Sequence, residues 1–140
     1  MLSFRKNIFY VMRLGLILTG RVSACGRVQQ NPSEDNAGVT VEMAVEPEQP
    51  AVGPAMLIFT LKDEAGQPVD NASLRVEGNM THAGMTPVFG EATAGQNGRY
   101  QVPFEWTMGG DWFITVNITL PDGQELSREF PVTVSGQSGQ

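Results

Sequence analysis

The sequence predicts an all-β fold between residues 39 and 134, a seven-stranded antiparallel β-sandwich of the immunoglobulin-like kind. Apolar and polar residues alternate along six segments of this region, which is the two-residue period of a half-buried strand. No segment there repeats its apolar residues at helical spacing. Clusters of Gly, Pro, Asn and Asp separate the segments, as expected where antiparallel strands are joined by turns.

Each alternating segment carries one apolar stripe, which we expect to face the core. In chain order, the stripes are Val39, Val41, Met43 and Val45; Leu57, Phe59 and Leu61; Leu74 and Val76; Tyr100, Val102 and Phe104; Trp112, Ile114, Val116, Ile118 and Leu120; and Leu126, Phe130, Val132 and Val134. A seventh strand is expected within residues 86–93. The single Cys excludes the immunoglobulin disulfide. Trp112, on the longest stripe, is therefore predicted to anchor the core.

Three short segments predict where the chain turns. Residues 64–68, Glu-Ala-Gly-Gln-Pro, separate the second and third stripes. Asn97-Gly98 is a strong hairpin signal just before the Tyr100 stripe. Residues 121–123, Pro-Asp-Gly, lie between the last two stripes and predict a tight antiparallel hairpin.

Length and composition exclude several classes of function. The chain has 140 residues, which is enough for one domain. Nine Lys and Arg against fifteen Asp and Glu give a net charge of −6, which argues against nucleic-acid binding. One Cys and one His exclude a Cys-based zinc cluster and a multi-His metal site. No catalytic arrangement is apparent, so we expect a protein that is not an enzyme.

The first 24 residues have the features of a targeting segment. They hold four basic residues and no acid, whereas residues 25–140 hold five basic and fifteen acidic residues. An apolar run at residues 8–18, interrupted by Arg13, is too short to span a bilayer, which needs about 20 apolar residues. Met12 is an alternative start.

The small residues before Cys25 resemble the lipobox of bacterial lipoproteins, whose cysteine is acylated with fatty acids such as palmitate after the chain is cut just before it. The resemblance implies a signal peptide over 1–24 and a lipidated Cys25. It places the chain on the extracytoplasmic face of a bacterial membrane, held by the lipid anchor. Arg21 departs from the apolar residue that is usual at its position. The alternative is an ordinary secretory signal in which Cys25 has no role.

Two polar segments flank the predicted sandwich. Residues 25–38 are rich in turn formers and follow no period, so they are expected to be a flexible tether after the lipidated cysteine. Residues 135–140 are expected to be a disordered tail. The folded domain is then residues 39–134.

The residues with metal-binding chemistry gather in two short stretches. Met80, His82 and Met85 lie within six residues, and Met108 lies in a Gly-rich connection further on. In an extended backbone Met80 and His82 would share one face, and Gly84 permits a turn toward them. Thioethers suit Cu(I), and imidazole suits copper in either oxidation state. The alternative is that these methionines fill the core.

Four segments together resemble the YtkA-like and FixH-like domain family. They are Gly66–Ala72, the Met-x-His-x-x-Met stretch at 80–85, Asn97–Tyr100 and Met108–Trp112, within a likeness that covers roughly residues 54–134. The family consists of small extracytoplasmic β-sandwich domains, often lipoproteins, that occur alongside copper handling, metal efflux and cytochrome oxidase assembly. The resemblance implies Met80, His82, Met85 and Met108 as copper ligands, and a membrane transporter or oxidase as partner. The alternative function is a non-catalytic module that docks on such a partner.

Overall fold

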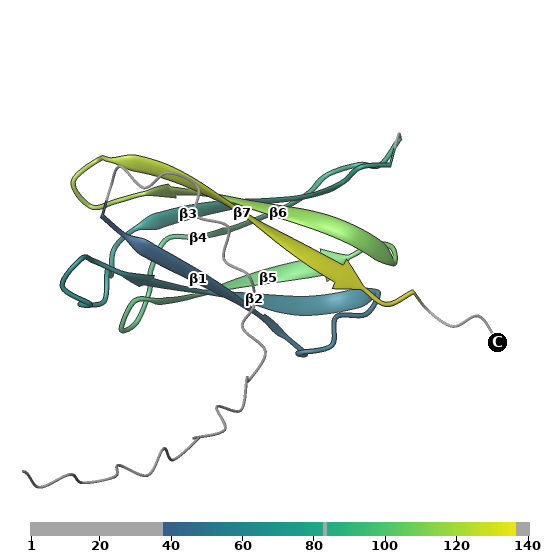
Figure 1. The fold of residues 1–140 in the computed structure, drawn as a ribbon, viewed down its shortest axis with the longest axis horizontal. Helices are drawn as coiled ribbons and strands as arrows, with labels where there is room; N and C mark the ends of the chain where they lie inside the picture. Colours follow the sequence, from purple (N-terminus) through teal and green to yellow (C-terminus); the bar gives the residue numbers. More distant parts are fainter. Residues whose placement is uncertain (1–37, 83, 137–140) are drawn as a thin grey trace, which may run out of the picture. The chain divides into compact units, whose positions relative to one another are not determined.

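Residues 38–82 and 84–136 are described by the structure, a computed structural model, and form two antiparallel sheets packed face to face (Figure 1). The signal peptide, Cys25, nearly all of the tether and residues 137–140 of the tail lie outside the described residues. No helix among the described residues is long and apolar enough to cross a bilayer. The seven strands are β1 (Thr40–Glu46), β2 (Gly53–Lys62), β3 (Ser73–Met80), β4 (Val88–Ala92), β5 (Arg99–Trp106), β6 (Gly110–Thr119) and β7 (Glu125–Val134).

The strand order confirms the predicted antiparallel sandwich. One sheet has the order β1-β2-β5 and the other has the order β4-β3-β6-β7. Every pairing within the two sheets is antiparallel. In the sheet arrangement of immunoglobulin constant domains, the fourth strand joins the first, second and fifth. Here β4 pairs with β3 instead, which widens the second sheet to four strands.

The core lies between the two sheets and is formed by the predicted stripes. On β6 every second residue from Trp112 to Ile118 is buried, and the residues between them reach solvent. The largest fully buried side chains are Trp106, Trp112 and Tyr100. Gly78 in the middle of β3 makes room for the core, since an added Cβ would clash with Cζ of Phe104. Burial of these side chains stabilises the fold through the hydrophobic effect.

The turns form where the sequence predicts them. Asn97 and Gly98 both have positive φ, 53° and 74°, as the two-residue hairpin turn requires. Between β6 and β7, the backbone N–H of Gly123 donates to the carbonyl of Leu120 at 2.9 Å. The Asp122 carboxylate accepts the N–H of Gln124 there. These contacts close the predicted hairpin between the last two stripes.

The first residue after β7, Ser135, makes two backbone hydrogen bonds with the segment that joins β1 and β2. The N–H of Ser135 donates to the carbonyl of Pro50 at 2.8 Å, and its own carbonyl accepts the N–H of Val52. These bonds tie the end of β7 to the segment that joins β1 and β2. The four-stranded sheet, which contains β7, is thereby linked at this end of the sandwich to the segment between β1 and β2 of the three-stranded sheet.

Candidate functional site

Three connections emerge at one end of the sandwich, which we call the loop end: residues 47–52, 81–87 and 107–109. The strand register places them together. Gly53 at the start of β2 pairs with Trp106 at the end of β5. Met80 at the end of β3 pairs with Trp112 near the start of β6. In Figure 1 the β3–β4 connection extends beyond the neighbouring strand ends on this side. The loop end therefore carries all four methionine and histidine residues that the sequence singled out.

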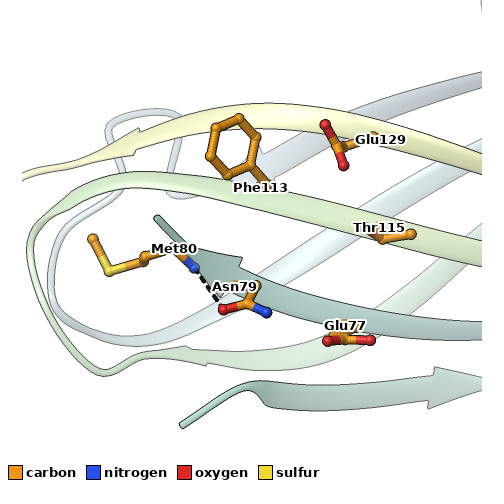
Figure 2. Close-up of a pocket in the computed structure, with 6 residues that line it drawn as sticks. All are labelled: Glu77, Asn79, Met80, Phe113, Thr115 and Glu129. Atoms are coloured by element: carbon orange, nitrogen blue, oxygen red, sulfur yellow. Dashed lines mark hydrogen bonds between the residues drawn. The ribbon is translucent and has the colours of Figure 1, made fainter. Parts of the chain in front are cut away.

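Met80 is part of the core at the loop end. Its side chain is 7% exposed, and its N–H donates to the side-chain oxygen of Asn79 at 2.9 Å. An added Cβ on Gly110 would lie only 2.8 Å from the Cε of Met80, so the thioether packs against the first residue of β6. Figure 2 shows the sulfur directed past the strand end, away from Asn79. The structure thus brings Met80 next to the β5–β6 connection.

Met108 lies in that same connection, with its side chain largely in solvent. It is 45% exposed, one of the two large hydrophobic side chains that are exposed among the described residues. Its carbonyl accepts the indole N–H of Trp112 at 3.0 Å. Its backbone is therefore fixed to the core while its thioether is free to reach a ligand. Met80 and Met108 occupy adjacent segments.

His82 and Met85 lie in the β3–β4 connection and differ in their surroundings. The His82 side chain is exposed, and it makes no hydrogen bond with any described residue. Met85 is partly buried and packs against the core. Because β3 ends at Met80, the strand alternation that would place Met80 and His82 on one face does not extend to His82. The His82 side chain is exposed, whereas Met80 is buried.

Trp106 is a residue of the loop end that the sequence reasoning missed. It is fully buried, and its ring meets that of Trp112 edge to face at a centroid distance of 5.2 Å. Its indole N–H has no hydrogen-bond partner among the described residues. The signal was present, because Trp106 continues the alternation of Tyr100, Val102 and Phe104 by one step.

The donor atoms at the loop end suit a soft cation. Among the described residues, no group of three or more His, Cys, Asp or Glu side chains is placed to hold a metal ion. Zn²⁺, Ca²⁺ and Mg²⁺ need such nitrogen, thiolate or oxygen ligands. What the loop end offers is three thioethers and one imidazole, a set that fits Cu(I).

Comparisons with known proteins place the chain in a family. The soluble domain of PmoD from Methylocystis sp. ATCC 49242 (Rockwell) is a similar solved structure, with a TM-score of 0.45 and 16% sequence identity over 68% of this chain and 90% of that one. A search of curated proteins found no match. The YtkA-like sequence profile matches residues 34–117, which is more than half of the chain. The chain therefore belongs to the YtkA-like family.

Proposed function

We propose that this protein is a lipid-anchored, extracytoplasmic copper-handling protein of the bacterial cell envelope. It binds Cu(I) at the loop end through Met80, His82, Met85 and Met108. The observation that carries the proposal is the packing of Met80 against Gly110, two residues after Met108. Two methionines from distant parts of the sequence, one buried and one exposed, thus lie on adjacent segments at one end of the sandwich.

Binding would require small rearrangements of side chains that now pack against the core. Met80 is buried and Met85 is partly buried, whereas His82 and Met108 already reach solvent. A methionine side chain is unbranched, with three rotatable bonds, so a thioether at the edge of the core can turn toward an ion at low cost. Gly84, with a φ of 85°, holds the β3–β4 connection in a turn. His82 and Met85 lie on either side of that turn.

Copper affinity tests this proposal directly. The full chain should be studied with Cys25→Ser in every sample, because a free thiol would itself bind Cu(I). In competition with a chromophoric Cu(I) chelator, this protein should retain one copper ion. His82→Ala and Met80→Leu/Met85→Leu should each weaken retention by about tenfold or more, which corresponds to about 1.4 kcal/mol of binding free energy.

The matched control for the thioether variant is Met43→Leu/Met56→Leu. It makes the same chemical change on β1 and β2 and should leave copper affinity unchanged. Both tryptophans of the chain lie near the loop end, so bound copper should quench their fluorescence. Equal and weak retention by all of these proteins would contradict the proposal and leave the methionines as packing residues.

The membrane anchor is a separate part of the proposal, and it rests on Cys25. An acylated N-terminal cysteine carries two or three chains, which is enough for stable anchoring. Metabolic labelling with a fatty acid should mark the mature protein and leave Cys25→Ser unlabelled. The variant should also remain unprocessed or be released from the membrane. Equal labelling of the two proteins would contradict the assignment of Cys25.

The second candidate is a non-catalytic module that docks on a membrane transporter or oxidase. Phe89 favours it, because this large apolar side chain is 65% exposed, and exposed aromatic side chains are common at protein contacts. Under both candidates the protein binds and does not catalyse. The copper titration decides whether docking is its whole function.

A further inference from the structure

The outer face of the four-stranded sheet carries aromatic side chains that no described element covers. We call it the outer sheet face. The residues that point to it alternate along the strands and include Phe89 on β4, Arg75 and Glu77 on β3, Phe113 and Thr115 on β6, and Glu129 on β7. Phe89 is 65% exposed and Phe113 is partly exposed. Exposed aromatics on a sheet face favour contact with another molecule.

A shallow pocket of about 390 Å³ opens on this face beside Phe113 and reaches Met80 at the end of β3. Glu77, Thr115 and Glu129 form one row across three neighbouring strands. Figure 2 shows the threonine between the two carboxylates and the Phe113 ring on the same face. Adjacent strands are about 4.8 Å apart, so the two glutamate backbones are separated by two such spacings. That width admits one flat polar group between the carboxylates.

Charge determines the kind of occupant. Neither Glu77 nor Glu129 has a hydrogen bond or ion pair with a described residue. Arg75 is the one basic side chain of this face among the described residues, and it is paired in register with Glu91. Two unpaired carboxylates beside an aromatic ring fit a cationic side chain. Arginine fits best, because its planar guanidinium pairs with carboxylates and stacks on aromatic rings.

The charge of the chain argues against two other occupants. Residues 25–140 hold five basic and fifteen acidic side chains, so a second copy of the chain would be repelled by like charge. An anionic membrane surface would be repelled for the same reason. A protein partner with a basic, partly apolar surface is complementary to this face in charge and also offers apolar contacts to its exposed aromatic rings.

We infer that the outer sheet face docks a protein partner by accepting an arginine side chain between Glu77 and Glu129, with apolar contacts to Phe113 and Phe89. This goes beyond copper binding, which involves the loop end. It also gives the docking candidate a defined surface and a defined partner chemistry.

The test uses a seven-residue acetylated peptide with one central arginine flanked by leucines. It is titrated into the ¹⁵N-labelled full chain at low salt and followed by amide chemical shifts. The peptide should bind with a Kd in the millimolar range or tighter. Its shifts should concentrate on β3, β4, β6 and β7 around Glu77, Phe89, Phe113 and Glu129. Replacing the arginine by citrulline, which has the same shape without the charge, should weaken binding by about tenfold.

Variants of the chain complete the test. Glu77→Gln/Glu129→Gln should weaken binding of the arginine peptide at least about fivefold. Glu42→Gln/Glu105→Gln makes the same change of charge on the exposed outer face of the other sheet and should change Kd less than about twofold. Phe89→Ala should weaken binding without changing the dependence on the arginine charge.

Three results would overturn the inference. They are an absence of localised shifts, equal binding of the citrulline peptide, and equal losses in the two double variants. Concentration-dependent line broadening without peptide would instead identify a second copy as the occupant. Glu77→Gln/Glu129→Gln should retain copper, and His82→Ala, which leaves all the residues that line the pocket unchanged, should retain the peptide. Failure of either proposal can thus be recognised separately.

Discussion

Replacing Trp112 with alanine is expected to destabilise the sandwich by about 3–5 kcal/mol, the cost of removing a large buried aromatic side chain. The ring is fully buried and packs edge to face on Trp106 and Phe104, at centroid distances of 5.2 and 6.3 Å. Its indole N–H donates to the carbonyl of Met108, so the substitution also leaves that carbonyl without its donor. The free energy of unfolding of a native protein is about 5–15 kcal/mol, so the substitution would remove a large part of the stability.

Chemical denaturation followed by circular dichroism measures this loss without relying on tryptophan fluorescence. Phe89→Ala is the control, because it also removes an aromatic ring from a strand of the same sheet, but one that is 65% exposed. Its free energy of unfolding should stay within about 0.5 kcal/mol of the original protein. A Trp112→Ala protein with an unchanged midpoint and slope would show that the core does not depend on this ring.

The strands were predictable because burial on one face imposes a two-residue period on the sequence. On β6 the buried residues Trp112, Ile114, Val116 and Ile118 are the predicted stripe. The same reasoning, carried further along β5, would have found Trp106. The pairing of β4 with β3 was not predictable. A five-residue strand has too few alternating positions to specify its neighbour, and Phe89 breaks the pattern by facing solvent.

The candidate site was predictable in its chemistry but not in its geometry. The sequence places three thioethers and one imidazole in two short stretches, and the fold brings both to the loop end. Whether a side chain turns inward depends on where a strand ends. The sequence around Met80 holds no Pro or Asn-Gly signal that would mark the end of β3. The prediction that Met80 and His82 share a face assumed an extended backbone, whereas β3 ends at Met80 and the exposed His82 follows it.

Tyr100 illustrates a contact that no local pattern could reveal. Its ring was expected in the core, where it is fully buried. Its hydroxyl, however, donates to the carbonyl of Val69 at 2.7 Å and accepts the N–H of Ala72 at 3.0 Å. These partners are 31 and 28 residues away in the sequence. The hydroxyl thereby fixes the β2–β3 connection to β5.

Tyr100→Phe is expected to destabilise the domain by about 1–3 kcal/mol for each backbone group that loses its partner. The ring and its packing remain, so the loss isolates the two hydrogen bonds. Thermal and chemical unfolding of the full chain would measure it. The hydrogen bond from the Gly98 N–H to Asp70, at 2.6 Å, should persist in the variant. Unchanged stability would mean that water replaces the hydroxyl at both groups.

The same substitution should change the stability at alkaline pH. Burial raises the pKa of Tyr100 above its usual value near 10, and the nearby Asp70 carboxylate raises it further, while the hydrogen bond from Ala72 opposes the rise. Above pH 10 the unfolded chain loses this proton before the folded protein does, so ionisation favours unfolding. The stabilisation from the raised pKa is fully present below pH 10 and is lost as the pH rises toward the pKa of the folded protein. The free energy of unfolding should therefore fall more steeply above pH 10 in the original protein than in Tyr100→Phe, and parallel curves would contradict this assignment.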